Sequence, residues 1–318
     1  MTTYIIRRLL ITIPLLIAIS IITFALMQFA PGSPAVLDVD PNVPPEAREA
    51  QIEAMGLNEP LPVQYARWIS GVVTGDFGNS YITKRPVSDM LLERLPNTLI
   101  LMTAATILAI VIAIPIGIIS AVRQYTKTDY AITLVSFAGV AVPNFWIGLM
   151  LIMFLSVQFG WFPVGGVQTL NADFDIMDRL HHLFLPALVL ATADTAQLTR
   201  YTRTSMLEVK NQDYIRTARA KGFKESKVIL KHGLRNALLP LITLIAIMLP
   251  TLIGGSVVVE SVFSWPGLGD LFMTSVNQRD YPVIMIITML TAVLVVIGNL
   301  IADILYAIVD PRIEYRED

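Results

Sequence analysis

Cysteine is absent from this chain of 318 residues, and charged residues make up only 15% of it. Without a thiol, the chain forms no disulfide, no thiolate metal site and no cysteine nucleophile. A soluble domain carries about 25% charged residues, so this low charge and the 54% apolar content indicate a membrane protein. The net charge of −2 gives no support for a nucleic-acid partner.

Enzyme signatures are also missing. No Gly-Lys dipeptide occurs, so the chain lacks a phosphate-binding P-loop and does not itself hydrolyse ATP. There is no H-E-x-x-H and no G-x-S-x-G. Two of the three histidines, His181 and His182, are adjacent, and we interpret them as an unligated pair at the membrane surface. We therefore expect no catalytic residue, and no cofactor or metal bound by this chain.

Long uncharged runs are what the sequence has instead. Residues 9–37, 95–122, 130–172, 236–259 and 281–302 contain no Asp, Glu, Lys or Arg. Each is long enough for a helix that crosses the bilayer, which takes about 20 residues. A weaker sixth stretch, about 183–199, contains only Asp194. The sequence predicts an all-α polytopic membrane protein with six transmembrane helices, four of them with kinks at Pro115, Pro143, Pro186 and Pro250.

Positive charge orients these helices. With the N-terminus in the cytoplasm, 16 of the 23 Lys and Arg residues fall in internal segments. Five of the seven external ones lie in a single segment of 67 residues, and long segments cross the membrane largely regardless of charge. Both termini are therefore predicted to be cytoplasmic.

The orientation divides the chain into four parts. Residues 1–30 form the first transmembrane helix, 31–96 an extracytoplasmic cap segment, 97–309 a five-helix core and 310–318 a cytoplasmic tail. In the cap segment, Pro44-Pro45 begins a predicted helix that Gly56 ends, and Pro62 begins a second one. We expect a small folded helical cap, although two helices lying on the membrane surface would also fit.

The segment 200–236 is the largest cytoplasmic feature and carries ten basic residues. Two short helices fit, over about 213–221 and 224–232. Gly222 lies between them, where glycine allows a turn with positive φ. Two short helices joined by a glycine have a shape suited to docking, whereas basic charge alone would only enforce the internal orientation.

At this segment the sequence resembles the permease subunits of ATP-binding-cassette importers, in which the corresponding loop carries a Glu-Ala-Ala motif followed by Gly. Anchored on Gly222, the triad falls on Arg216, Thr217 and Ala218. The more specific resemblance is to the B-type permease subunits of oligopeptide and dipeptide importers, whose loop is similar to "DYIRTARAKG" followed by "HGLRN". The resemblance extends along the whole chain through the stretches "APGSP", "GDFGNS", "SVFSWPGLG", "QRDYPV" and "LYAIVDPRIEY". Within this group, the chain is most similar to the App-type oligopeptide branch.

The resemblance implies the type I importer permease fold and a heteromeric machine in the bacterial cytoplasmic membrane. Its partners would be a second homologous permease subunit, two ATPase subunits that bind ATP and Mg, and an extracytoplasmic peptide-binding protein. The 200–236 loop would dock in an ATPase subunit as a coupling helix. ATP-driven closure would then push the loop as a rigid body and turn the permease from inward-facing to outward-facing.

The resemblance also selects residues. Those of the coupling loop are Asp213, Tyr214, Arg216, Thr217, Ala218, Lys221, Gly222, His232 and Arg235. Because Arg216 stands where the general motif has an acid, we expect it to face an acidic or polar ATPase surface. Near the binding-protein contact the resemblance places Trp265, Pro266, Gly267 and Gly269, although a rigid connection would also explain this proline- and glycine-rich stretch.

Polar side chains in the sixth stretch are candidates for the translocation path. Asp194 and Gln197 lie at membrane depth, where polar groups usually face a protein interior or a water-filled cavity. An inert hydrogen-bonded packing of Asp194 is an equal alternative.

Two other functions stay open. A related importer would carry dipeptides, nickel complexes or sugar oligomers instead of oligopeptides. A free-standing secondary transporter or channel would usually need internal repeats and a site for a coupling ion, and the sequence shows neither.

Overall fold

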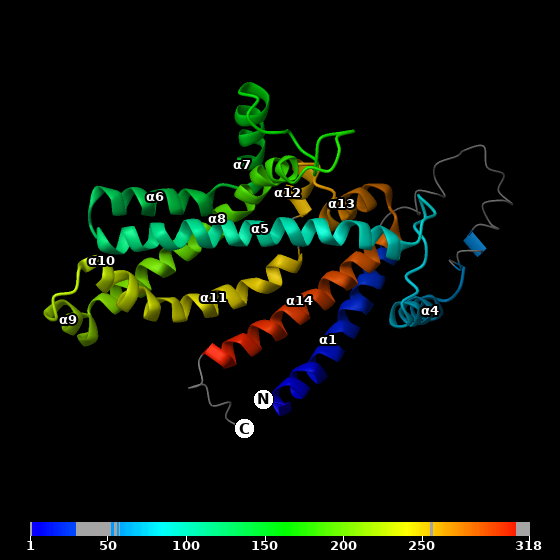
Figure 1. The fold of residues 1–318 in the computed structure, drawn as a ribbon. Coiled ribbons are helices and arrows are strands. Elements are labelled where there is room, and N and C mark those ends of the chain that lie inside the picture. Colours follow the sequence, from blue (N-terminus) through cyan, green and yellow to red (C-terminus); the bar gives the residue numbers. More distant parts are fainter. Residues whose placement is uncertain (1, 30–51, 54–55, 57, 255–256, 310–318) are drawn as a thin grey trace. The chain divides into compact units, whose positions relative to one another are not determined.

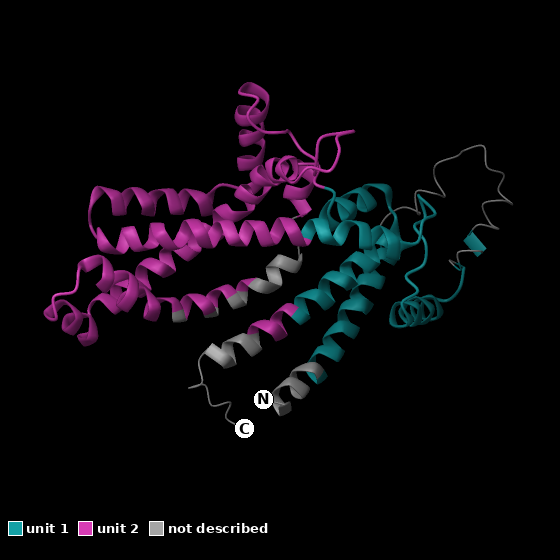
Figure 2. Cartoon of the chain, in the orientation of Figure 1, with its two compact units in different colours: residues 1–98, 266–297 teal, residues 99–265, 298–318 magenta. Residues whose placement is uncertain are grey.

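The computed structural model describes residues 2–29, 52–53, 56, 58–254 and 257–309. These residues are almost entirely helical, with one isolated β-bridge between Asn79 and Pro86 as their extended pairing. The chain divides into two compact units, residues 1–98 with 266–297 and residues 99–265 with 298–318 (Figure 2). We describe each unit by itself.

The first unit contains helices α1 (Thr2–Phe29), α4 (Leu61–Thr74) and α13 (Leu268–Gln278), with the first part of α5 (Val87–Val122) and most of α14 (Tyr281–Val309) (Figure 1). Pro62 lies in the first turn of α4, as predicted. α4 packs on α1, because Phe24 contacts the rings of Tyr65 and Trp68 at centroid distances of 5.5 and 6.1 Å. The hydroxyl groups of Ser20 and Tyr65 are 2.8 Å apart.

The other predicted cap helix and the predicted tail lie mostly or wholly outside the described residues, which omit 30–51 and 310–318. The second cap helix is confirmed as α4. The core of this unit is built from Val87 and Leu91 of α5, Leu268 and Leu271 of α13 and Val283 of α14.

The second unit is a helical bundle around α8 (Ile176–Lys210). Its other elements are the rest of α5, α6 (Lys127–Ala141), α7 (Asn144–Leu151) continued by the π-helix η1 (Ile152–Gln158), α9 (Asp213–Ala220), α10 (Glu225–Lys227), the π-helix η2 (Val228–Gly233), α11 (Leu234–Gly254) and α12 (Val257–Val262) (Figure 1). Small residues let α5 and α8 approach closely: a Cβ at Gly117 would lie 2.5 Å from the Thr202 Cβ.

Three described helical segments are long and apolar enough to cross a membrane, namely Leu10–Phe29, Val87–Val122 and Tyr281–Ala302. A fourth candidate is the pair Lys127–Ala141 and Asn144–Gln158, which is bent by 103°. Pro143 lies at this bend, where its ring prevents a continuous helical hydrogen-bond ladder. The kink predicted at Pro143 is in the structure a sharp bend between two helices, and the total of six spans stays a prediction.

Candidate functional site

The predicted coupling loop folds as one compact element that leaves the end of α8. α9 begins at Asp213 and ends at Ala220, within one residue of the predicted bounds. Gly222 follows with a φ of +74°, and its N–H donates to the carbonyl of Arg219 at 2.9 Å. The predicted glycine turn is confirmed. Glycine adopts this φ without strain, whereas most residues with a side chain do not, so the residue type favours the turn.

The second predicted helix, over 224–232, is different in the structure. A single α-helical turn, α10, passes into the π-helix η2, which runs on into α11 without a break. Val228 and Gly233 are both buried although they are five residues apart. In an α-helix these positions would point in different directions, whereas the wider π-helical turn puts them on one face.

The inner face of α9 is apolar. Ile215 and Ala218, three residues apart, are 2% and 5% exposed and pack against Val228 and against Val209 of α8. Ala218 therefore holds α9 on the body of the unit. Ala218 thus lies on the inner face of α9, and its part in docking stays a prediction. A cavity of about 110 Å³ lies beside this contact, lined in part by Met206, Ile229 and Gly233.

The outer face of the element carries most of the residues selected from the sequence. Those exposed to solvent are Asp213, Tyr214, Arg216, Thr217, Lys221, Gly222 and Arg235. Arg216 Nη1 lies 3.5 Å from a carboxylate oxygen of Asp213, and both side chains are largely exposed. A pair so exposed contributes about 0–1 kcal/mol, so the guanidinium is left accessible to a partner.

His232 is half-buried and has an internal role. Its ring stacks on Phe223 at a centroid distance of 5.7 Å, and the Lys227 ammonium lies 4.6 Å from the centre of the same Phe223 ring. These contacts join the residue after Gly222 to η2. Phe223 and Lys227 were not selected from the sequence, because their contacts depend on the turn between them.

An ion pair that sequence reasoning missed closes the turn from the other side. Arg219 donates to both carboxylate oxygens of Glu225, at 2.7 and 3.1 Å. These hydrogen bonds lower the pKa of Glu225 and raise that of Arg219. The two residues lie on opposite sides of Gly222, so only the turn geometry brings them together.

The two candidate path residues lie on α8. Gln197 lines a cavity of about 360 Å³ between α6 and α8, together with Thr133, Ser136, Phe137 and Arg200. Asp194 is half-buried one turn earlier and is not among the residues that line this cavity. Of the two, the structure places Gln197 on the wall of this cavity.

The stretch 265–269 is largely buried. Trp265 is 2% exposed and belongs to the apolar core with Leu185, Val189 and Phe263. Gly267 and Gly269 are buried, and Pro266 is half-buried. The Pro266 carbonyl accepts a hydrogen bond from Asn97 at 2.8 Å. This burial fits the alternative of a rigid connection, and the nearness of the stretch to a binding-protein contact stays a prediction.

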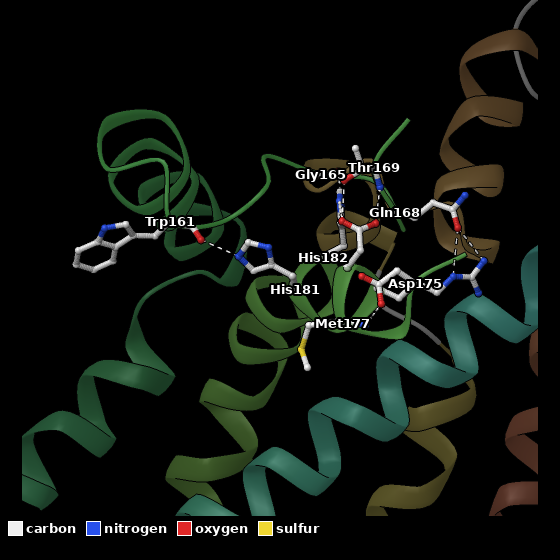
Figure 3. A network of polar contacts seen from close by, with 10 residues as sticks. Trp161, Gly165, Gln168, Thr169, Asp175, Met177, His181 and His182 are labelled. Carbon is white, nitrogen blue, oxygen red and sulfur yellow. Dashed lines mark hydrogen bonds and ion pairs between the residues drawn. The ribbon is translucent and has the colours of Figure 1, made fainter. Parts of the chain in front are cut away.

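His181 and His182 hydrogen-bond to the loop that precedes α8 (Figure 3). The His181 Nε2 N–H donates to the Trp161 carbonyl at 2.7 Å, and the His182 Nδ1 N–H to the Gly165 carbonyl at 3.0 Å. Asp178 accepts from the amide and the hydroxyl of Thr169, at 2.7 and 2.6 Å. Among the described residues, no group of three His, Asp or Glu side chains is placed to hold a metal ion.

The chain is similar to known transport proteins along nearly its whole length. Residues 113–315 match the family described as the binding-protein-dependent transport system inner membrane component, and residues 1–102 match its N-terminal companion family. The chain is 63% identical to the oligopeptide transport system permease protein AppB of Bacillus subtilis, over 99% of this chain and 100% of that protein. It is 40% identical to the glutathione transport system permease protein GsiC of Escherichia coli, over 99% and 100%.

Among solved structures, a chain of the MetNI methionine ABC transporter matches with a TM-score of 0.57 at 20% identity, over 70% of this chain and 96% of that chain. This likeness shows the type I importer permease fold. With all-helical described residues and matches along nearly the whole sequence, the chain belongs to the family of inner-membrane permease components of binding-protein-dependent transport systems.

Proposed function

We propose that this chain forms half of the translocation path of an ATP-driven importer of oligopeptides. The observation that carries this proposal is the compact element of α9, Gly222, α10 and η2. It has an apolar inner face fixed to α8 and a polar outer face left exposed. A free-standing carrier does not need an exposed docking element, whereas a permease driven by separate ATPase subunits needs one to contact them.

The proposed assembly contains a second homologous permease subunit, two ATPase subunits and an extracytoplasmic binding protein. ATP and Mg are bound by the ATPase subunits. The exposed residues of the coupling element contact an ATPase subunit, with Arg216 facing an acidic or polar surface. Closure of the ATPase pair moves the element as a rigid body.

In the membrane, we assign six spans, namely α1, α5, the bent pair α6 and α7–η1, α8, α11 and α14. Both termini are cytoplasmic, residues 31–96 form the external cap segment, and residues 97–309 form the permease core. Gln197 lines the path, and Asp194 is a weaker candidate. The segment 265–269 connects α12 and α13 near the binding-protein side.

Oligopeptides are the favoured substrate because the relative that is 63% identical along the whole chain is named for their transport. Dipeptides, nickel complexes and sugar oligomers are the alternatives within the family. Uptake measurements with each class by the complete complex would rank them.

The test is peptide-dependent ATP hydrolysis by the co-expressed complex in liposomes, with Gly222→Pro as the variant. Proline requires a φ near −65°, so it cannot adopt the +74° of Gly222. We expect the peptide-stimulated part of the hydrolysis to be lost while the subunits still co-purify. Gly222→Asn is the matched control, because asparagine tolerates this backbone region, and it should retain stimulation.

Undiminished stimulation in Gly222→Pro would show that the element only orients the protein. Stimulation absent from the unmodified complex with every peptide tested would refute the importer function itself.

A further inference from the structure

A buried carboxylate near the beginning of α6 joins three segments of the second unit. Asp129 is 3% exposed and accepts from the backbone N–H of Tyr125 at 2.9 Å and from the hydroxyl of Ser120. The guanidinium of Arg203 donates to both carboxylate oxygens, each at 2.9 Å. The end of α5, the turn before α6 and the middle of the cytoplasmic half of α8 therefore meet at one side chain.

The geometry of this contact is specific. A guanidinium that donates two parallel hydrogen bonds to a carboxylate fixes orientation as well as distance. Tyr125 has a φ of +62°, a conformation rare for a bulky residue, and its N–H is held by the same carboxylate. The Asp129 side chain is 4% exposed and the Arg203 side chain 26% exposed, so the carboxylate lies in the interior while the guanidinium reaches it from the edge of the cavity.

The position of Arg203 connects the pair with the coupling element. Arg203 lies seven residues before Lys210, where α8 ends, which is about 10 Å along the helix axis. Within these turns Met206 packs with Ala121 of α5 and Ala237 of α11. Val209 packs with Ile215 and Val228 of the coupling element. The last turns of α8 and the coupling element thus form one continuously packed body.

The same pair reaches the candidate path. Ser120 and Arg203 both line the cavity of about 360 Å³ between α6 and α8, as Gln197 does. One side of the pair is therefore rigidly linked to the coupling element, and the other side belongs to the hairpin of α5 and α6 that forms a wall of this cavity.

We infer that Asp129 and Arg203 are a positioning pair that transmits movement of the coupling element to the cavity wall. The end of α5 is already packed on α8 through Ala121 and Met206, so when the element moves, the bidentate contact makes the beginning of α6 follow α8 as well. The inference rests on the proposed function and names the contact through which that function is coupled.

The test uses the complete complex in liposomes with Asp129→Asn, Arg203→Gln and the double variant. Four quantities are measured: assembly, peptide-independent hydrolysis, peptide-stimulated hydrolysis and peptides imported per ATP. Coupling between sites is typically worth five- to 150-fold, so we expect about a tenfold fall in peptides imported per ATP, with assembly and peptide-independent hydrolysis unchanged. Because each single variant removes the same contact, the double variant should be no worse than either.

Glu93→Gln is the matched control, since it breaks the Arg85–Glu93 ion pair at 2.5 Å, whose side chains are 49% and 55% exposed. This variant should import as many peptides per ATP as the unmodified protein. Arg203→Lys is the second variant, because it keeps the charge beside Asp129 but not the forked hydrogen bonds, and its import per ATP should be intermediate.

An unchanged number of peptides per ATP in Asp129→Asn and Arg203→Gln would overturn the inference, as would losses that multiply in the double variant. If both single variants fail to assemble, Arg203→Lys decides: import per ATP equal to the unmodified protein overturns it, and a reduced value with normal assembly supports it. A complex without any peptide stimulation before mutation refutes the proposed function instead.

Discussion

Across the Gly222 turn, the guanidinium of Arg219 donates two hydrogen bonds to the carboxylate of Glu225, at 2.7 and 3.1 Å. The pair fixes the angle between α9, which carries Arg219, and α10, which carries Glu225. It does so at a surface, where the side chains are 37% and 56% exposed, so its worth is at most about 1 kcal/mol. Its effect is therefore local to the turn.

This contact predicts a pH dependence. Because Arg219 lowers the pKa of folded Glu225 below its ordinary 4.5, the stabilising contribution is complete above pH 4.5 and is lost as the pH falls through the lowered pKa. Amide exchange at Phe223 should accelerate over that range beyond the intrinsic change. In Glu225→Gln this extra acceleration should be absent; an identical pH profile in the variant would contradict the role of the pair.

Ala218→Asp should loosen the coupling element. A carboxylate at a position that is 5% exposed, against Ile215 and Val228, would be buried without a partner at a cost of several kcal/mol. Amide exchange over 213–222 should become fast, and ATPase subunits should no longer co-purify. Ala220→Asp is the control, because Ala220 is exposed on the same helix; equal exchange in the two variants would refute the assigned inner face.

Gly117→Ala should lower the thermal stability of the purified protein. The added methyl group would lie 2.5 Å from Thr202 Cβ and 2.9 Å from the Thr199 carbonyl oxygen, so α5 and α8 must separate, at about 1–3 kcal/mol. Gly139→Ala is the matched helical control.

At Gly139 the nearest atoms to an added Cβ are the Thr192 carbonyl oxygen at 3.5 Å and the Ala196 Cβ at 3.8 Å. That contact is ordinary, and alanine favours helix over glycine by about 1 kcal/mol. The melting temperature of Gly139→Ala should therefore be equal or higher. A Gly117→Ala protein that melts no lower than Gly139→Ala would show that the two helices are not held at this distance.

Asp178→Ala should release the loop that contains Thr169 from the beginning of α8. It removes the acceptor for both the amide and the hydroxyl of Thr169. We expect faster amide exchange at Thr169, whereas Asp173→Ala, at an exposed position in the same segment, should leave it unchanged. Slow exchange at Thr169 in Asp178→Ala would mean that other contacts hold the loop.

Several elements follow from local patterns and were predictable. Charge-free runs located the long apolar helices, Pro62 the beginning of α4, and "DYIRTARAKG" both α9 and the positive φ of Gly222. In each case a single residue type or a short periodic run decides the conformation. Membership in the permease family was also predictable, because short motifs along the chain indicated it.

What sequence reasoning missed depends on contacts between distant residues. The Arg203–Asp129 pair joins positions 74 residues apart, and no periodic pattern links them. The burial of Trp265 follows from packing against α8 rather than from its proline- and glycine-rich neighbours. The bend at Pro143 was expected only as a kink, because a proline marks where a helix breaks and tertiary packing sets the angle.

The π-helical η2 joins α10 to α11 with one more residue per turn than an α-helix would use. Deleting one residue from 228–233 and closing the stretch into an ordinary helix would therefore leave the direction of α9 relative to α11 nearly unchanged. Deleting a residue while the π-turn is kept would instead rotate everything before it around the axis of α11, because each residue of an α-helix advances the chain by about 100°. The stretch can thus lose a residue without turning the docking surface only by giving up its wide turn.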